Sequence, residues 1–269
     1  MKVNVFIPSY NEKHSELLMA FADGIPGAQV HPLESYDPCD VAVIFGGVKK
    51  AYPPTWAKKT VLKKHYGRRL IMVESAFVGR GMYHQVGWGG AAGYGDFRAD
   101  KNPPLDRWDM IGVAEDWSIV KNGYVVVMGQ LPRDVQVQDV DHRAWCRETV
   151  AYYEARDIPV VFRPHPKTND PTEYGVPANL IDRNVDLADT LRTARTVVTW
   201  NSTSAVDAVI AGVPTITMHR GSFAWDVTAH DLDTLNHACD RDRWLATLGY
   251  AQWTTAEMAS GEVWHWLTA

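Results

Sequence analysis

Short apolar runs rich in β-branched residues alternate with longer helix-like stretches along most of the 269-residue chain. The apolar runs do not alternate in polarity, which is typical of strands covered on both faces of a parallel sheet. The alternation stops in a glycine-rich stretch, 79–104, and starts again at GYVVVMGQLP. We therefore predict an α/β fold with two Rossmann-like domains, 1–118 and 119–269, that face a central cleft. The predicted strands cover 2–8, 28–33, 40–48, 68–75, 123–132, 159–167 and 196–200, and the predicted helices cover 13–23, 53–65, 141–157 and 187–195.

A last helix is predicted near the end of the second domain. Thr254 and Glu257 have the three-residue spacing of a capping box, in which each residue satisfies a backbone N–H at the start of a helix. The helix would then continue to Trp264 and Trp266. We assign it to the second domain, 119–269.

Four consecutive polar residues, Asn201, Ser202, Thr203 and Ser204, follow the apolar run that ends at Trp200. Parallel sheets bind ligands beyond the carboxyl ends of their strands, where a helix N-terminus favours phosphate. We predict that Ser204 caps the next helix together with Asp207 and that the other three residues contact a ligand. The alternative is a well-capped helix without a ligand, but a cap needs only one such residue.

A second polar cluster, RPHPK, leaves the run 159–163. Arg163, His165 and Lys167 supply three donors, and the two prolines stiffen the turn between them. Both clusters follow strands of the same predicted domain, so we expect both to face one phosphate-bearing ligand.

The glycine-rich stretch 79–104 contains seven glycines between Gly79 and Gly95, interleaved with aromatic residues. A long segment without a regular pattern is usually functional or disordered, and its aromatic content argues against disorder. We interpret it as an ordered loop that helps to form a site. Its Asp96 and the preceding Glu74 are the two candidate general bases, with Asp96 favoured; the alternatives are a turn residue and a structural hydrogen-bond acceptor. Arg80 and His84 are expected to line the same site.

The composition is typical of a globular protein that does not cross a membrane. The chain is 46% hydrophobic and 22% charged, as expected for a globular protein. It contains no apolar run near the ~20 residues needed to cross a bilayer, and its start does not resemble a signal peptide. Cys39, Cys146 and Cys239 lack metal-site spacing. We therefore expect a cytoplasmic protein without membrane insertion.

Charge is unevenly distributed. The net charge of −5 argues weakly against nucleic acid as a partner, yet no acidic residue lies between Asp40 and Glu74. This interval is either a lysine-rich helix surface or a binding surface for an anionic partner. Its basic residues are Lys49, Lys50, Lys58, Lys59, Lys63, Lys64, Arg68 and Arg69.

The HP element and the N-S-T-S junction about 35 residues later resemble the donor-binding half of GT-B glycosyltransferases, in particular the HP-motif and capsule-polysaccharide transferases. The tail AQWTTAEMASGEVW and the segment 74–97 are similar to phage-encoded members that modify DNA. The resemblance covers roughly 124–266 and, less specifically, 40–100. It implies a GT-B fold with the donor in the second half and the acceptor in the first.

The resemblance also implies roles for individual residues. Arg163, His165, Ser202, Thr203 and Ser204 would hold the donor phosphates, with Asn201 beside them. Lys167 and Asp207 are looser candidates for a phosphate and the nucleoside. The chain departs from the group in its small first half and in the absence of a DxD motif. We therefore expect no cofactor and no metal, with a nucleotide sugar as co-substrate.

Three functions follow as hypotheses. The first is transfer of a sugar onto the hydroxymethyl group of a modified pyrimidine in phage DNA, in the host cytoplasm. The basic residues, including Lys49, Lys50, Lys58, Lys59, Lys63 and Lys64, would contact DNA phosphates, and aromatic residues would stack on a displaced base. The second is a cytoplasmic transferase of surface or capsular polysaccharide, and the third is a non-catalytic nucleotide- or DNA-binding protein. The donor's base and sugar, the acceptor base, inversion or retention, and the oligomeric state stay open.

Overall fold

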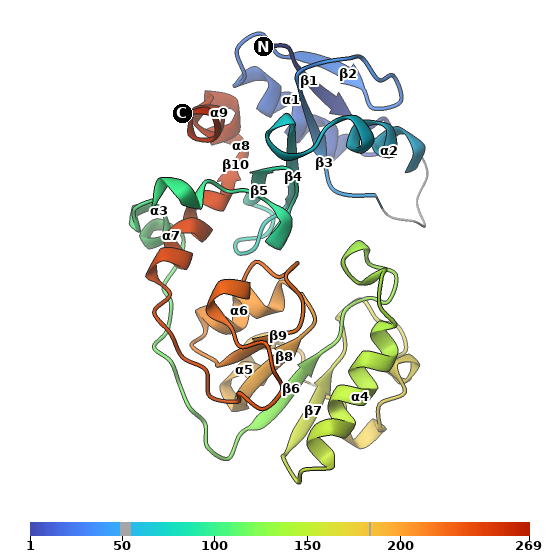
Figure 1. Cartoon of the computed structure of the whole chain (residues 1–269), viewed down its shortest axis with the longest axis vertical. Coiled ribbons are helices and arrows are strands. Elements are labelled where there is room, and N and C mark those ends of the chain that lie inside the picture. Colours follow the sequence, from blue (N-terminus) through green and yellow to red (C-terminus); the bar gives the residue numbers. More distant parts are fainter. Residues whose placement is uncertain (49–54, 183) are drawn as a thin grey trace. The chain divides into compact units, whose positions relative to one another are not determined.

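The computed structural model describes residues 1–48, 55–182 and 184–269 and divides the chain into two compact units. Unit 1 contains Met1–Gly112 and Asp242–Ala269, and unit 2 contains Val113–Arg241 (Figure 1). No described helix has the length and apolar composition needed to cross a membrane. The strands are β1 Val3–Ile7, β2 Gln29–Pro32, β3 Val41–Phe45, β4 Leu70–Ser75, β5 Tyr83–Trp88, β6 Tyr124–Met128, β7 Val160–Arg163, β8 Ala194–Thr199, β9 Thr215–Thr217 and β10 Gln252–Thr254. The α-helices are α1 Glu12–Asp23, α2 Thr55–Lys64, α3 Asp106–Ile111, α4 His142–Glu154, α5 Leu187–Thr193, α6 Ser204–Ile210, α7 Asp242–Ala251, α8 Thr255–Ser260 and α9 Glu262–Thr268.

Unit 1 is built on a sheet of order β10-β5-β4-β3-β1-β2 within the described residues. The strands β4, β3, β1 and β2 are parallel, whereas β5 and β10 are antiparallel to their neighbours. The strand order reverses between β1 and β3, because β1 pairs with β2 on one side and with β3 on the other. The apolar strands are buried as predicted: Val5, Val43 and Ile71 have no exposed surface.

Unit 2 contains a parallel sheet of order β7-β6-β8-β9. On one face, Val125 and Val127 pack with Cys146 and Tyr153 of α4. On the other face, β6 and β8 pack with residues of α5 and α6. The strand order reverses between β6 and β8, since β6 pairs with both β7 and β8.

The boundary between the units differs from the expected division into 1–118 and 119–269. The first segment ends at Gly112, close to the expected position, but the last helix belongs to unit 1. Strand β10 pairs with β5, and Met258, Val263 and Leu267 are buried in the same cluster as Val5. The physical reason is that the apolar sides of α8 and α9 pack into the core of the first segment. The capping box marks only where α8 starts and does not indicate which sheet the helix packs against.

The capping box itself is confirmed. Glu257 N–H donates to Thr254 Oγ1 over 3.2 Å, and Thr254 N–H donates to Glu257 Oε2 over 2.7 Å. These two bonds satisfy N–H groups that α8 cannot satisfy internally.

The glycine-rich stretch contains a strand, which corrects its interpretation as a loop without regular structure. It contains β5, and two of its glycines lie against the buried ring of Phe97. A Cβ on Gly87 or Gly95 would lie 2.7 Å or 2.6 Å from that ring, which is closer than side-chain atoms approach in folded proteins. The glycines therefore permit close packing at the sheet.

Side chains near the end of the glycine-rich stretch form hydrogen bonds to the C-terminus of α9. Arg98 Nη1 donates to Leu267 O over 2.6 Å, and Lys101 Nζ donates to Trp266 O over 2.6 Å. Trp88 Nε1 also donates to Leu267 O over 3.0 Å. Cationic donors at a helix C-terminus satisfy its last carbonyls and complement the helix dipole.

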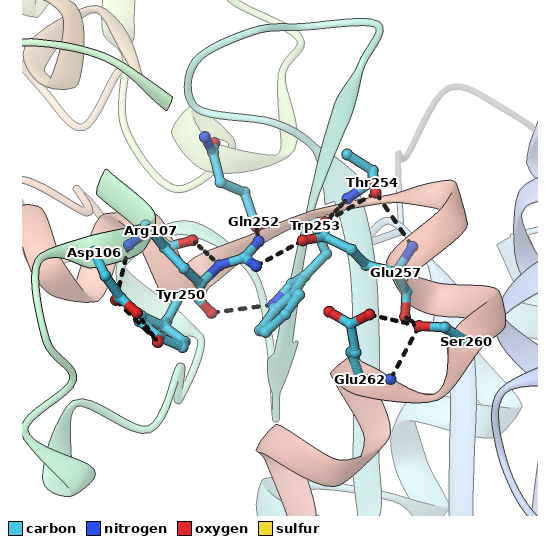
Figure 2. A network of polar contacts seen from close by, with 10 residues as sticks. Asp106, Arg107, Tyr250, Gln252, Trp253, Thr254, Glu257, Ser260 and Glu262 are labelled. Atoms are coloured by element: carbon cyan, nitrogen blue, oxygen red, sulfur yellow. Dashed lines mark hydrogen bonds and ion pairs between the residues drawn. The ribbon is translucent and has the colours of Figure 1, made fainter. Parts of the chain in front are cut away.

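Arg107 of α3 connects the segment 249–257 to the first part of unit 1 (Figure 2). Its side chain donates to Gly249 O over 3.1 Å, Gln252 O over 3.2 Å and Glu257 Oε1 over 2.6 Å. The guanidinium carbon lies 3.9 Å from the centre of the Trp253 ring. This buried arginine therefore joins α3, α7, β10 and α8.

Candidate functional site

The carboxyl ends of the four parallel strands of unit 2 bring together polar residues from distant parts of the sequence. Gln130 follows β6, His165 follows β7, Asn201 and Ser202 follow β8, and His219 follows β9. Ligands of open α/β sheets bind at the carboxyl edge where the strand order reverses. Here the reversal lies between β6 and β8, so Gln130, Asn201 and Ser202 lie at its two sides.

Two side-chain amides bridge this reversal point. Gln130 Nε2 donates to Asn201 Oδ1 over 2.9 Å, and Asn201 N–H donates to Gln130 Oε1 over 3.2 Å. Asn201 Nδ2 also donates to Gln136 O over 2.9 Å, and the residue is only 1% exposed. Asn201 therefore positions the loop after β8, in contrast to its expected contact with a ligand.

The loop after β6 is fixed in a similar way. Gln130 N–H donates to His142 Nε2 over 2.8 Å, and Tyr174 OH donates to Gln130 O over 2.7 Å. Burial lowers the pKa of His142 to about 4, so its ring is neutral near pH 7 and Nε2 can accept this bond. Gln130 is thus held through both its backbone and its side chain.

The start of α6 corrects the predicted cap. Thr203 is the N-cap residue and makes no capping bond with its side chain. Instead, Ser202 Oγ accepts the Ser204 N–H over 3.2 Å, and Ser204 Oγ is buried without a hydrogen-bond partner among the described residues. The cap prediction is wrong because Ser204 already has a helical backbone, which points its hydroxyl away from the orphan N–H groups. Asp207 lies in the first turn of α6.

Two half-buried histidines flank the loop after β8. Lys167 N–H donates to His165 Nδ1 over 3.1 Å, and Gly221 N–H donates to His219 Nδ1 over 3.0 Å. In a neutral ring, a hydrogen bond accepted at Nδ1 places the ring proton on Nε2. The sequence predicted His165 and missed His219, although His219 follows the apolar run VPTITM in the same way that His165 follows its strand.

The two clusters predicted from the sequence do lie at one edge of one sheet, but they are not adjacent. Strand β6 separates β7 from β8, and neighbouring strands are about 4.8 Å apart, so His165 and Ser202 leave strands that are about 10 Å apart. His219 leaves the strand next to β8. One phosphate could therefore reach Ser202 and His219 together, while His165 would contact another part of an extended ligand.

A row of rings borders this edge. The ring centres of Trp145 and Trp200 are 5.7 Å apart, and those of Trp200 and His219 are 5.5 Å apart with a 16° angle between the planes. His142 stacks on Trp145 at 5.3 Å. Flat aromatic surfaces of this kind suit stacking of a planar ligand group.

Arg163 differs most from its expected role. Its guanidinium donates to Asp182 Oδ2 over 2.7 Å, Thr190 Oγ1 over 2.8 Å and Val185 O over 3.1 Å. Burial raises the pKa of Asp182, but hydrogen bonds from Thr190 and Arg163 outweigh it and hold the pKa below its ordinary value. The arginine therefore fixes Asp182, Val185 and Thr190 to the end of β7. Lys167, by contrast, is exposed.

The two candidate general bases, Glu74 and Asp96, lie at opposite ends of the strands in unit 1. Glu74 lies at the carboxyl end of β4, the edge at which parallel sheets bind ligands. Asp96 pairs with Trp88, whose partner Ile71 lies near the start of β4, so Asp96 lies at the opposite edge. Asp96 also accepts from Arg68 Nε over 3.2 Å. The preference for Asp96 is not supported, because the antiparallel β5 carries the end of the glycine-rich stretch away from the ligand edge.

Arg80 and His84 lie at the same edge as Glu74. His84 pairs with Ser75 at the end of β4, and Arg80 bridges to Tyr83 at the start of β5. Burial lowers the pKa of His84, which favours the neutral ring.

The basic interval is only partly a surface patch. Lys59, Lys63 and Lys64 are exposed on α2, whereas Lys58 is half-buried and donates to Phe45 O over 2.6 Å. Arg68 and Arg69 are also exposed, and Arg68 pairs with Asp96 and Asp100. Lys49 and Lys50 lie outside the described residues. Among the residues that the structure describes, no three His, Cys, Asp or Glu side chains are grouped to hold a metal ion.

The sequence matches no protein-family model and no curated protein. Two solved structures resemble the chain over nearly its whole length. Both come from KpsC of Thermosulfurimonas dismutans. The β-Kdo 2,7 transferase is 11% identical with a TM-score of 0.55 and covers 98% of this chain and 99% of its own. The β-Kdo 2,4 transferase is 14% identical with a TM-score of 0.55 and covers 93% and 90%. The predicted α/β fold of the GT-B type, with two Rossmann-like units, is confirmed.

Proposed function

We propose that the protein is a glycosyltransferase that binds a nucleotide sugar at the carboxyl edge of unit 2. The observation that carries this proposal is that Ser202, His165 and His219 follow three strands of one parallel sheet at its carboxyl edge, where Ser202 and His219 leave neighbouring strands and His165 leaves the strand on the other side of β6. The likeness to two Kdo transferases over nearly the whole chain supports it.

The chemistry of this edge suits a phosphate ester. The Nε2–H groups of the two histidines and the exposed Lys167 are donors for phosphate oxygens. Fixed donors stabilise the negative charge that develops on the departing phosphate, because they need no reorganisation during the reaction. Trp200, beside Ser202, offers a surface for the nucleobase. These groups supply the stabilisation that a metal-independent transfer requires.

The proposal includes two acceptor classes. The first is the hydroxymethyl group of a modified pyrimidine in DNA, for which Lys59, Lys63 and Lys64 with the exposed Trp56 and Tyr66 would bind the polymer. The second is a surface or capsular glycan, and the Kdo transferase neighbours support it. A non-catalytic nucleotide-binding role is the remaining alternative.

Transfer from radiolabelled nucleotide sugars tests the proposal. The panel should include CMP-Kdo and UDP-, GDP- and dTDP-hexoses, each offered hydroxymethylated DNA, unmodified DNA and capsule oligosaccharides. Incorporation into modified DNA alone supports the first acceptor, and incorporation into the oligosaccharide supports the second. Tight nucleotide binding without incorporation or hydrolysis would contradict an enzymatic role.

A histidine pair of variants tests the donor site. We expect His219→Asn to weaken nucleotide-diphosphate binding at least tenfold, because it removes the Nε2–H donor, and His219→Gln to recover most of the affinity, because its amide nitrogen reaches the same place. Calorimetric titration measures both constants. His230→Gln serves as the control, since His230 stacks on Trp225 and should be replaceable without loss. Equal effects of the Asn and Gln variants would contradict a donor role for Nε2.

A further inference from the structure

The carboxyl edge of the unit 1 sheet gathers charged groups that the donor site does not use. The strand order reverses there between β1 and β3. His14 lies in the first turn of α1 after β1, Gly46 follows β3, and Glu74 lies near the end of β4. Lys58 of α2 reaches the same place, because its Nζ donates to Phe45 O over 2.6 Å and to Gly47 O over 3.4 Å.

Gly46 forms the centre of this group. It has a positive φ of 65° and no side chain, and a Cβ there would lie 3.0 Å from Glu74 Oε2 and 3.6 Å from Lys58 Nζ. The carboxylate and the ammonium therefore approach the same small space above the glycine. The ring of His14 stacks on Phe45 at 3.7 Å between centres, which fixes it next to Gly46.

The carboxylate is oriented as well as placed. Glu74 Oε1 accepts both the N–H and the hydroxyl of Ser75, over 2.9 Å and 3.2 Å. Oε2 is the oxygen that faces Gly46. The Lys58 ammonium approaches the same space from α2.

We infer that Glu74, Lys58 and His14 form an acceptor site around Gly46, in which Glu74 removes the proton from a hydroxyl group of the incoming acceptor. The inference rests on the proposed function. Glu74 Oε2 takes the hydroxyl proton as the acceptor oxygen forms a bond to the sugar's anomeric carbon. The bond from that carbon to the phosphate oxygen breaks, and the electron pair leaves with the phosphate. Because Glu74 is negatively charged, the reacting group is an uncharged hydroxyl and not a phosphate or carboxylate.

Lys58 is a positioning residue in this account. It holds the end of β3 through Phe45 and Gly47 and supplies the charge beside Glu74. His14 contributes a flat, polar ring beside the reacting group. The exposed Lys59 shares the helix but does not share these contacts, so it provides a matched comparison.

Glu74→Gln tests the inference with the donor and acceptor found for the wild-type protein. A general base contributes about 10²–10⁴-fold, so we expect kcat for transfer to fall at least a hundredfold while the Kd for the nucleotide diphosphate changes less than twofold. Glu16→Gln, an exposed change on α1, is the control, and equal melting temperatures establish that the variants are folded.

Lys58→Met supplies a second measurement. Removing the ammonium should lower kcat for transfer while the Kd for the nucleotide diphosphate stays unchanged, Lys58→Arg should restore kcat, and Lys59→Met should leave it at the wild-type value. Transfer that survives Glu74→Gln at the wild-type rate, or a kcat that Lys58→Met does not lower, overturns the inference alone. A wild-type protein that neither binds nor transfers a sugar overturns the proposed function and the inference together.

Discussion

Arg107→Ala is expected to lower the free energy of unfolding of unit 1 by about 3–5 kcal/mol, the range found when one partner of a buried ion pair is removed. The Arg107 side chain is only 10% exposed, and its loss leaves Glu257, Gly249 O and Gln252 O without their donor. It also removes the cation that covers the Trp253 ring. Urea unfolding at pH 7, followed by tryptophan fluorescence, measures the change.

The same variant should change the response to acid. Burial raises the pKa of Glu257, but bonds from Arg107 and Thr254 outweigh it and keep the pKa below its ordinary value of about 4.3. A lowered folded-state pKa adds stability above the unfolded-state pKa, and that stability is lost as the pH falls through the folded-state value. Arg107→Ala should therefore flatten the decline of stability below about pH 4.3.

Two comparisons separate this network from a general effect of arginine. Arg68→Ala removes an exposed pair with Asp96, for which we expect a change within about 1 kcal/mol. Hydrogen exchange should accelerate in 242–269 for Arg107→Ala and stay unchanged for Arg68→Ala. A loss of protection confined to α3 would contradict the view that Arg107 joins the last segment to the rest of unit 1.

Asn201→Ala is expected to weaken both stability and donor binding. The change leaves Gln130 Nε2 and Gln136 O without their partners in a buried place, and each unsatisfied group costs about 1–3 kcal/mol. Because Asn201 directly precedes Ser202, we expect the loop to shift and the Kd for a nucleotide diphosphate to rise at least tenfold. Unfolding of unit 2 and calorimetric titration provide the two measurements.

Ser204 offers the matched control for stability. Its buried hydroxyl lacks a hydrogen-bond partner among the described residues, so Ser204→Ala should leave the free energy of unfolding unchanged or raise it. If Asn201→Ala and Ser204→Ala had equal effects on stability, the amide bridge between Gln130 and Asn201 would not be the stabilising feature.

The regular parts of the fold could be predicted because burial on both faces leaves a direct mark on the sequence. The runs around Val43 and Val126 are apolar and the run around Val198 is rich in β-branched residues, and each forms a parallel strand. Strand β5 was not predicted from the sequence, because the glycines in and around YHQVGW, which pack on Phe97, are typical of loops. The sequence also did not predict that α9 packs in unit 1, since an apolar helix face does not specify which hydrophobic core it joins.

Site residues were harder to predict because a polar side chain can bind a ligand or its own chain. Arginine and asparagine often bind phosphates and sugars, yet Arg163 and Asn201 donate hydrogen bonds to other residues of the protein. Asp96 and Glu74 are close in sequence to the same loop, but the reversal of direction at β5 separates them to opposite edges. His219 lies in no recognisable motif, and only the parallel pairing of β8 with β9 brings it beside Ser202.

The chain leaves unit 1 at Gly112 and returns to it at Asp242, which has a consequence for biosynthesis. The inserted unit is continuous and can reach its native state as soon as Arg241 has emerged from the ribosome. At about 5–20 residues per second, the surface that α8 and α9 will cover stays without them for roughly 7–30 seconds. During that interval the apolar side chains around Leu18 and Phe21 are exposed to solvent in the nascent chain. We therefore expect chaperones to bind this region.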